Sequence, residues 1–223
     1  MHDDAAQNLA ERSSDANELA SLAHHQDVRV RELVARNVAT AGPVLARLVS
    51  DPEIAVRTAA AGNQALPTDV LHNLLATVGV ELYYAAANPA STPKDIAPLV
   101  CGTHPAQRAA AAASPHVDEG DLALLARDPD AGVRAAAAGN LGAPEPVLTQ
   151  LAQDPDPSVV DAVAGNRNAP LAVLAKLPVA RVPAWQVLTF IDRSVTDPVA
   201  RRASLDRVDT AGDAPLGALL EPR

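Results

Sequence analysis

Apolar and polar residues follow one another along the chain in a way that predicts pairs of short helices. The segment DPDAGVRAAAAGN begins at Asp128 and contains residues at i, i+3, i+4 and i+7, a spacing that places them on one face of a helix. A segment led by Pro144 follows, in which Leu148 and Leu151 have the i, i+3 spacing of a second short α-helix or 3₁₀ turn. The residues on the shared face of the first helix are Val133, Ala136, Ala137 and Asn140.

The two-helix pattern recurs along most of the chain. A first ladder, with steps of 26, 25, 26, 26 and 26 residues, consists of Asn37, Asn63, Asn88, Ser114, Asn140 and Asn166. A second ladder, in the second helix and with the same steps, consists of Leu45, Leu71, Ile96, Leu122, Leu148 and Leu174. Its members from the second onward have an apolar partner three residues later, namely Leu74, Leu99, Leu125, Leu151 and Leu177. The short step falls between Leu74 and Leu82, in a connection where deletions are expected.

Local signals agree with the ends of these helices. The Asp-Pro pairs at Asp51, Asp128 and Asp154 precede the first helix, and we expect them to open it, because aspartate caps free N–H groups and proline fits the first turn. Glycine and asparagine follow the alanine run, as at Gly139 and Asn140, where such residues stop a helix.

One repeat of this size cannot be stable alone. Ordering 26 residues costs roughly 40 kcal/mol at about 1.5 kcal/mol each, and a few leucines and valines cannot offset that without neighbouring repeats. The sequence therefore predicts an all-α solenoid of about 26-residue repeats, each a short α-helix plus a second short α or 3₁₀ helix. We expect an N-terminal cap at residues 1–23, a six-unit array at 24–177, and degenerate repeats, a cap and a frayed tail at 178–223.

The ends of the array are atypical, as the outermost repeats of a solenoid are expected to be. NELASLA, around Leu19, has the pattern of a lone second helix ahead of the first full unit. After Leu177 the register is lost, and a last unit is expected to resume at Asp197-Pro198.

Composition agrees with a helical protein. Hydrophobic residues make up 48% of the 223 residues but aromatic residues only 2%, so the core consists of small side chains that let helices approach closely. The acidic opening MHDDAAQNLAERSSD lacks the apolar run of a signal peptide, and no stretch approaches the roughly 20 apolar residues of a membrane span. These features predict a cytoplasmic protein.

Charge and candidate chemistry narrow the function. A formal net charge of -9 works against the phosphate contacts on which nucleic-acid proteins depend. Cys101 is the only cysteine and His24 and His25 point in different directions on a helix, so we expect no metal and no cofactor. Catalytic triads, paired carboxylates and phosphate loops are not recognisable, which predicts a protein that is not an enzyme.

The pattern DPxxxVRxAxAxN followed by xxxPxxxLxxL, clearest in Asp51 to Leu74 and Asp128 to Leu151, resembles the variant leucine-rich repeat family of bacterial proteins. The resemblance covers about Asp27 to Leu177 and implies a right-handed superhelix of alternating α and 3₁₀ helices, without strands and without a specific activity. Some members carry a cysteine-rich cluster-binding module, and this sequence has none. The third unit, TVGVELYYAAAN, departs from the pattern because it lacks both Asp-Pro and the arginine, and the fourth has Ser114 for asparagine.

Two ladders of polar residues are candidates for either structure or binding. We expect the asparagines to be structural, because an amide offers a donor and an acceptor to unpaired main-chain groups across neighbouring repeats. The arginines at one repeat position could instead fork onto phosphates or acidic partners. The alternative is that each arginine pairs with an aspartate of an Asp-Pro in its own or an adjacent unit. These residues are Arg31, Arg57, Arg108 and Arg134.

Three aromatic residues are the remaining candidates for binding. Tyr83 and Tyr84 stand where other units carry small residues, and tyrosine is favoured at interfaces. Trp185 is a second candidate contact, although filling space at the degenerate end is the role we expect for it.

The sequence therefore favours a non-enzymatic scaffold that presents a curved repeat surface to a protein or peptide partner, whose identity it does not reveal. One alternative is a helical-repeat protein that binds nucleic acid through the arginine row, with base-repair chemistry at Trp185 and Asp192. Another is an accessory subunit of an enzyme complex.

Overall fold

The computed structural model describes residues 2–220. The chain divides into two compact units, Met1–Val117 and Asp118–Arg223, each described by itself below. The helices of the first unit are α1 (His2–Arg12), α2 (Ala16–Leu22), α3 (Val28–Arg36), α4 (Gly42–Leu48), α5 (Ile54–Ala61), α6 (Thr68–Leu75), α7 (Glu81–Ala86), α8 (Pro93–Val100) and α9 (Pro105–Ala113). Those of the second are α10 (Glu119–Leu125), α11 (Ala131–Gly139), α12 (Glu145–Leu151), α13 (Pro157–Gly165), α14 (Leu171–Leu174), η1 (Val179–Arg181), α15 (Ala184–Ser194), α16 (Pro198–Leu205), α17 (Val208–Ala211) and η2 (Leu216–Leu220).

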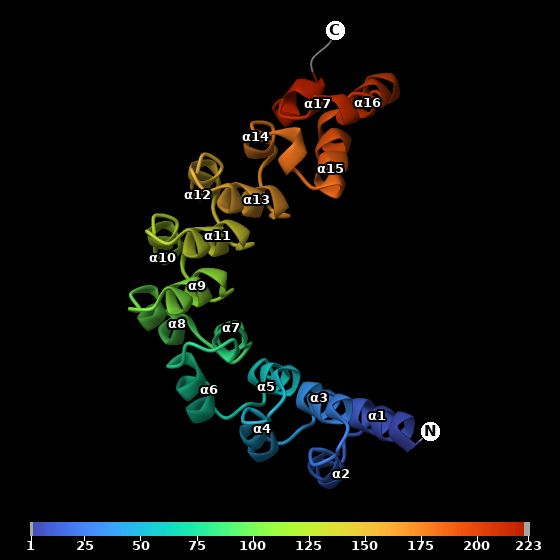
Figure 1. The fold of residues 1–223 in the computed structure, drawn as a ribbon, viewed down its shortest axis with the longest axis vertical. Coiled ribbons are helices and arrows are strands. Elements are labelled where there is room, and N and C mark those ends of the chain that lie inside the picture. Colours follow the sequence, from blue (N-terminus) through green and yellow to red (C-terminus); the bar gives the residue numbers. More distant parts are fainter. Residues whose placement is uncertain (1, 221–223) are drawn as a thin grey trace. The chain divides into compact units, whose positions relative to one another are not determined.

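Helices of two kinds alternate within the first unit. The odd-numbered helices α1, α3, α5, α7 and α9 lie side by side, and each following even-numbered helix packs against them in a second layer (Figure 1). In the second unit α11 and α13 lie side by side in the same way, with α10, α12 and α14 as the second helices. The prediction of an all-α repeat fold with two short helices per repeat is confirmed. Its limits at residues 24 and 177 stay a prediction.

The core lies between these two layers. Every member of the second-helix ladder, from Leu45 to Leu174, is at most 2% exposed, and burying a side chain of this size stabilises the fold by about 1.5–3 kcal/mol. Among the partners three residues later, Leu74 lies in α6 as predicted but is half-buried, and Leu75 is buried beside it. α6 continues through Leu75, so the apolar face of this helix includes one residue more.

The N-terminal cap contains a complete helix pair. The interpretation of the segment around Leu19 as a lone second helix is wrong, because α1 precedes α2 and packs against α3 as α3 packs against α5. Ala10 of α1 and Leu19 of α2 are fully buried. The acidic opening of the chain thus forms the first helix of a repeat-like pair, which its low hydrophobicity concealed.

The Asp-Pro pairs of the array do not open helices, contrary to the prediction. α11 begins at Ala131, and its N-cap is Asp130, whose side chain accepts a hydrogen bond from the Val133 N–H. The Asp128 carboxylate instead accepts one from the Asp130 N–H, at 2.9 Å. This Asx turn places each Asp-Pro ahead of the helix rather than at its cap.

The C-terminal end of the second unit closes on itself. The Leu216 and Gly217 N–H groups donate to the carbonyls of Leu177 and Ala175, at 2.7 and 2.8 Å, so the last described segment covers the end of α14. At α16 an Asp-Pro does open a helix, because Asp197 caps it through the Ala200 N–H at 2.9 Å. The tail at residues 221–223 lies outside the described residues.

Candidate functional site

The asparagine ladder of the first unit joins each repeat to the one before it. The Asn63 amide donates to the carbonyls of Ala35 and Asn37, at 2.8 and 3.0 Å, and its oxygen accepts from the Ala65 N–H at 3.0 Å. Asn88 makes the corresponding bonds one repeat later, to the carbonyls of Ala61 and Asn63 at 2.6 and 3.0 Å. Each side chain therefore satisfies three main-chain groups that have no partner within their own helices.

Asn37 extends the ladder into the cap. Its amide donates to the carbonyls of Ala10 and Ser13, at 3.0 and 2.9 Å. α1 is thus tied to the array in the same way as a repeat.

The fourth repeat replaces its missing asparagine with two residues. The Ser114 hydroxyl donates to the Ala86 carbonyl at 2.6 Å, and the His116 Nε2 lies 3.0 Å from the Asn88 carbonyl. The Ser114 hydroxyl oxygen also accepts from the His116 N–H at 3.1 Å. Serine and histidine together make the three contacts of one asparagine, so the departure from the sequence pattern leaves no gap in the ladder.

In the second unit the ladder continues beyond the recognisable repeats. The Asn166 amide donates to the carbonyls of Ala138 and Asn140, at 2.7 and 2.9 Å. The next donor is Gln186 of α15, which is buried and donates to the Asn166 carbonyl at 3.0 Å. Sequence reasoning missed Gln186 because it lies 20 residues after Asn166 and outside the 26-residue register.

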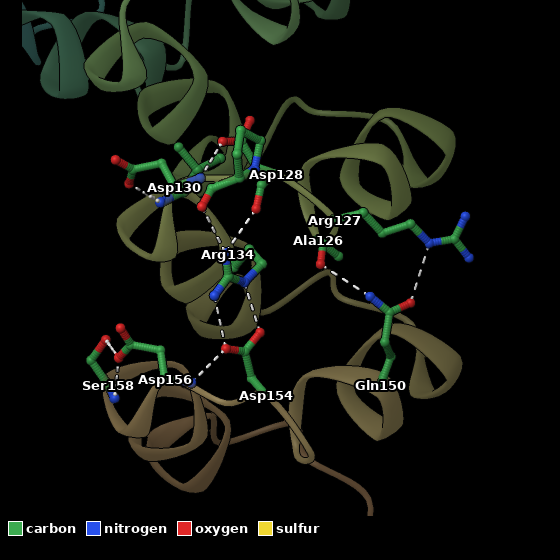
Figure 2. Close-up of polar contacts among 11 residues, drawn as sticks. Ala126, Arg127, Asp128, Asp130, Arg134, Gln150, Asp154, Asp156 and Ser158 are labelled. Atoms are coloured by element: carbon green, nitrogen blue, oxygen red, sulfur yellow. Dashed lines mark hydrogen bonds and ion pairs between the residues drawn. The ribbon is translucent and has the colours of Figure 1, made fainter.

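Two residues of the arginine row form forked ion pairs with the aspartate of the next Asp-Pro. Arg31 places its Nε and one terminal nitrogen 2.8 and 3.1 Å from the two Asp51 oxygens. Arg134 does the same with Asp154, at 2.7 and 2.9 Å, and its third nitrogen donates to the Asp128 carbonyl at 2.8 Å (Figure 2). The Arg134 and Asp154 side chains are only 15% and 7% exposed. These guanidinium groups are therefore occupied inside the protein.

The other two arginines occupy the same kind of position. Arg57 pairs with Glu81 at 2.5 Å and donates to the carbonyls of Asp51 and Pro52, both at 2.9 Å. Glutamate at the start of α7 takes this role because the third repeat lacks an Asp-Pro. Arg108 donates to the Gly102 carbonyl at 3.0 Å.

The paired aspartates have lowered pKa values. The Arg134 hydrogen bonds hold the pKa of Asp154 below its usual value, against the opposing effect of burial. At Asp51 burial raises the pKa, but hydrogen bonds from Arg31 and the Glu53 N–H outweigh it and leave the pKa lowered. Both carboxylates therefore hold their charge, and their arginines, at acidic pH.

The two tyrosines lie together on α7. Tyr83 is 38% and Tyr84 47% exposed, and the Tyr84 ring lies over Gly62, where an added Cβ would be 3.9 Å from Cδ1. The corresponding positions of the helices on either side carry Thr58 and Ala59 in α5 and Ala109 and Ala110 in α9. A bulky, exposed aromatic pair thus stands where the neighbouring repeats carry small side chains.

Trp185 does not fill the degenerate end, contrary to the expectation. It is 45% exposed, whereas Phe190 of the same helix is 2% exposed and provides the aromatic core there. The Arg167 Cζ lies 5.9 Å from the centre of the Trp185 ring. α15 turns its Phe190 face inward, since Gln186 next to Trp185 is fixed to the ladder. Asp192, the other residue considered for base repair, pairs with Arg201.

The histidines are dispersed among structural roles. His24 contacts Arg47, His72 lies 2.9 Å from an Asp95 oxygen, and His104 caps α9 through the Ala106 N–H. Among residues 2–220 no three histidine, cysteine or acidic side chains gather in a group that could hold a metal ion.

The first unit also contains a shallow cavity. It measures about 350 Å³ and is lined by residues of α6, α8 and α9, including Leu75 and Leu99 at its floor and His72, Lys94 and Asp95 at its rim. The His72–Asp95 contact lies at this rim, and the lining residues include no serine, threonine or cysteine.

The helices form pairs, and side chains that bond to the main chain of the preceding repeat hold these pairs in register. This arrangement defines the class of protein as an α-helical repeat protein. The family model Leucine rich repeat variant matches residues 131–156, one repeat from the start of α11 to the N-cap of α13. This repeat thus matches the family that the sequence pattern resembles.

A comparison with solved structures gives one described as a leucine-rich repeat variant with a novel repetitive protein structural motif. It is 22% identical to this chain over 87% of this chain and 75% of its own, with a TM-score of 0.46. A search of curated proteins gives no match. None of the helices within the described residues is long and apolar enough to cross a membrane.

Proposed function

We propose that this protein is a non-enzymatic cytoplasmic scaffold that binds a protein or peptide partner through Tyr83 and Tyr84 of α7. The observation that carries the proposal is the exposure of these two rings at positions where the neighbouring repeats carry small side chains. Tyrosine suits a protein interface because its ring gives a large contact area and its hydroxyl can still form a hydrogen bond. The exposed Cys101 thiol, without a second cysteine, fits a reducing compartment such as the cytoplasm.

The polar ladders support this assignment by what they leave available. Asparagine amides of both units are bonded to the main chain, Arg31, Arg57 and Arg134 to carboxylates, and Arg108 to the Gly102 carbonyl, so both ladders are engaged within the protein. The net charge of -9 adds long-range repulsion of nucleic acid. The nucleic-acid alternative therefore has no specific observation in its favour.

Selection of peptides tests the proposal without requiring the identity of the partner. A phage-displayed library of random 12-residue peptides is selected on the immobilised wild-type protein, and enriched peptides are synthesised and measured against variants. We expect Tyr83→Ala with Tyr84→Ala to weaken their binding at least about tenfold, because aromatic anchors carry most interface energy.

A matched control uses two other exposed apolar residues of the same unit, Leu9→Ala with Val38→Ala, which are expected to bind the peptides as the wild type does. Circular dichroism melting curves check that both double variants are folded. Absence of any enriched peptide, or equal binding to both double variants, contradicts the proposal. Retention of a single-stranded oligonucleotide at physiological salt would favour the nucleic-acid alternative instead.

A further inference from the structure

A strip of exposed residues runs along one edge of the second unit, at the loops after the first helices. The Asn168 amide donates to the Leu141 carbonyl at 2.8 Å, which brings the loop after α13 beside the loop after α11. The Arg167 guanidinium then lies over the ring of Trp185, and Leu188 follows Trp185 one helical turn later. Leu141, Trp185 and Leu188 are all exposed. The strip therefore combines one guanidinium with three apolar side chains.

The last rung of the ladder holds this strip in place. Asn166 and Gln186 are both buried and bonded to each other, Gln186 Nε2 to the Asn166 carbonyl. Arg167 and Trp185 are their immediate neighbours in sequence, so the buried bond fixes the relative position of the exposed pair. A positioned pair loses less conformational freedom on binding than two independent surface side chains.

Arg167 differs from the arginines of the row in having no partner of its own. Within residues 2–220 its guanidinium makes no hydrogen bond or ion pair, and its Cζ lies 5.9 Å from the centre of the Trp185 ring. Stacking on a ring occupies the face of a guanidinium and leaves the N–H groups at its edge free to donate. Those N–H groups form the fork that a carboxylate fits.

Neighbouring carboxylates do not compete for this fork. Asp161 of α13 pairs with Arg181 at 3.0 Å, and Asp192 of α15 pairs with Arg201. Arg167 therefore brings to this strip a positive charge that no ion pair neutralises within residues 2–220, although the whole chain carries a net charge of -9. Charge complementarity specifies a ligand with a carboxylate, and the exposed leucines and tryptophan specify apolar side chains beside it.

We propose that Leu141, Arg167, Trp185 and Leu188 form a second docking surface, which binds a peptide segment whose acidic residue is flanked by apolar residues. The carboxylate binds the edge of Arg167, and the flanking side chains cover Trp185 and the two leucines. This proposal rests on the proposed scaffold function in one respect only, namely that the partner is a peptide segment. A single-stranded nucleic acid fits less well, because the Arg167 guanidinium already covers a face of the ring and no second exposed aromatic residue continues the platform among the described residues of this unit.

Trp185 is the only tryptophan in the chain, so its fluorescence reports occupancy of this surface directly. The probes are two equimolar mixtures of acetylated, amidated seven-residue peptides, one with a central Glu flanked by Leu, Ile or Phe, the other identical except for a central Gln. We expect a saturable change in emission with the Glu mixture and at least a tenfold weaker response with the Gln mixture. Arg167→Gln is expected to abolish this preference.

Arg193→Gln is the matched control, since it removes the same charge from an exposed position of α15 that has no ion pair. Its response is expected to equal that of the wild type. No saturable response to the Glu mixture up to millimolar concentration, equal responses to both mixtures, or equal affinities of Arg167→Gln and Arg193→Gln would overturn the proposal. Tighter binding of a fluorescein-labelled dT15 oligonucleotide than of the Glu mixture would assign the surface to nucleic acid instead.

Failure here is distinguishable from failure of the scaffold proposal. The peptide selection reads contacts of Tyr83 and Tyr84 in the first unit, whereas the fluorescence titration reads Trp185 in the second. Successful selection with a negative titration contradicts only the second docking surface.

Discussion

Replacing Asn63 by leucine tests the structural role of the ladder most directly. The side chain is 6% exposed and serves the carbonyls of Ala35 and Asn37 and the N–H of Ala65. Leucine has a similar size but can satisfy none of these groups. The Ala35 carbonyl and the Ala65 N–H would lose their partner at roughly 1–3 kcal/mol each, whereas the Asn37 carbonyl keeps the Thr40 N–H at 3.1 Å, so the predicted loss is about 2–6 kcal/mol. This is a large share of the roughly 5–15 kcal/mol by which a domain is stable.

The fourth repeat supplies a rescue for the same position. Asn63→Ser alone leaves the Asn37 carbonyl with the Thr40 N–H as its remaining donor and is expected to cost about 0.5–1.5 kcal/mol. Adding Ala65→His reproduces the arrangement of Ser114 and His116, in which the histidine supplies the missing donor. We expect the double variant to recover most of the stability lost in Asn63→Ser.

Urea unfolding followed by far-UV circular dichroism measures these differences as shifts in the midpoint at constant slope. Gln64→Leu is the matched control, because it makes a comparable change at the adjacent exposed position and is expected to stay within about 0.5 kcal/mol of wild type. Equal midpoints for Asn63→Leu and Gln64→Leu would refute the structural interpretation. A rescue variant no more stable than Asn63→Ser would show that the geometry of the fourth repeat does not transfer.

The remaining predictions concern the second unit. Arg134→Leu leaves the Asp154 carboxylate without its partner and is expected to cost about 2–4 kcal/mol of stability. Arg134→Leu combined with Asp154→Leu should cost less than the sum of the two single changes. Additive losses in a double-mutant cycle measured by urea unfolding would contradict a stabilising interaction between the two side chains. The pKa of Asp154 is lower folded than unfolded, so its stabilisation is complete above about pH 4 and lost below it. The urea midpoint should therefore decrease as the pH is lowered past about 4, and it should decrease less in the double-leucine variant. An increase of the midpoint in this pH range would show that the pKa shift has the opposite sign. Gln186→Leu removes the Gln186 donor to the Asn166 carbonyl and should cost about 1–3 kcal/mol. In this variant Trp185 fluorescence should change at a lower urea concentration than circular dichroism does. Coincident curves with the same midpoint as the wild type would exclude a role of Gln186 in anchoring α15.

Periodicity made much of the fold predictable. Asn63 and Leu71 recur in register because every repeat makes the same contacts to its neighbour, so the same residue types are needed at the same spacing. The two helices per repeat and the buried apolar ladder follow from that spacing. The start of α11 at Ala131 does not, since Asp128 and Asp130 are equally good capping residues in sequence and only the Asx turn distinguishes them.

Sequence reasoning could not predict the positions where a different residue type makes the contact that an asparagine or aspartate makes in the other repeats. His116 takes over half of an asparagine's role from a position two residues later, and Gln186 does so from outside the register. Glu81 replaces an aspartate next to the one-residue deletion. Each of these side chains reaches the same main-chain group or arginine from a different point, which is visible only in three dimensions.

The exposure of Trp185 could not be predicted for a related reason. In sequence, Trp185 and Phe190 are equivalent candidates for the core of α15. The rotation of that helix is set by Gln186, whose bond to the ladder turns Phe190 inward and leaves the tryptophan outside.

The direction of the asparagine ladder has a consequence for how such genes lengthen. Asn63 donates its amide backward to the Asn37 carbonyl and offers its own carbonyl forward to the Asn88 amide. A repeat copied in tandem by unequal crossing-over therefore arrives with both complementary edges already in place. Growth or loss in whole units is compatible with folding at once, without compensating mutations elsewhere. An in-frame insertion of a few codons within a helix would instead shift every later asparagine donor by the same number of residues relative to the carbonyls of the preceding repeats. The ladder thus favours evolutionary change in steps of one repeat.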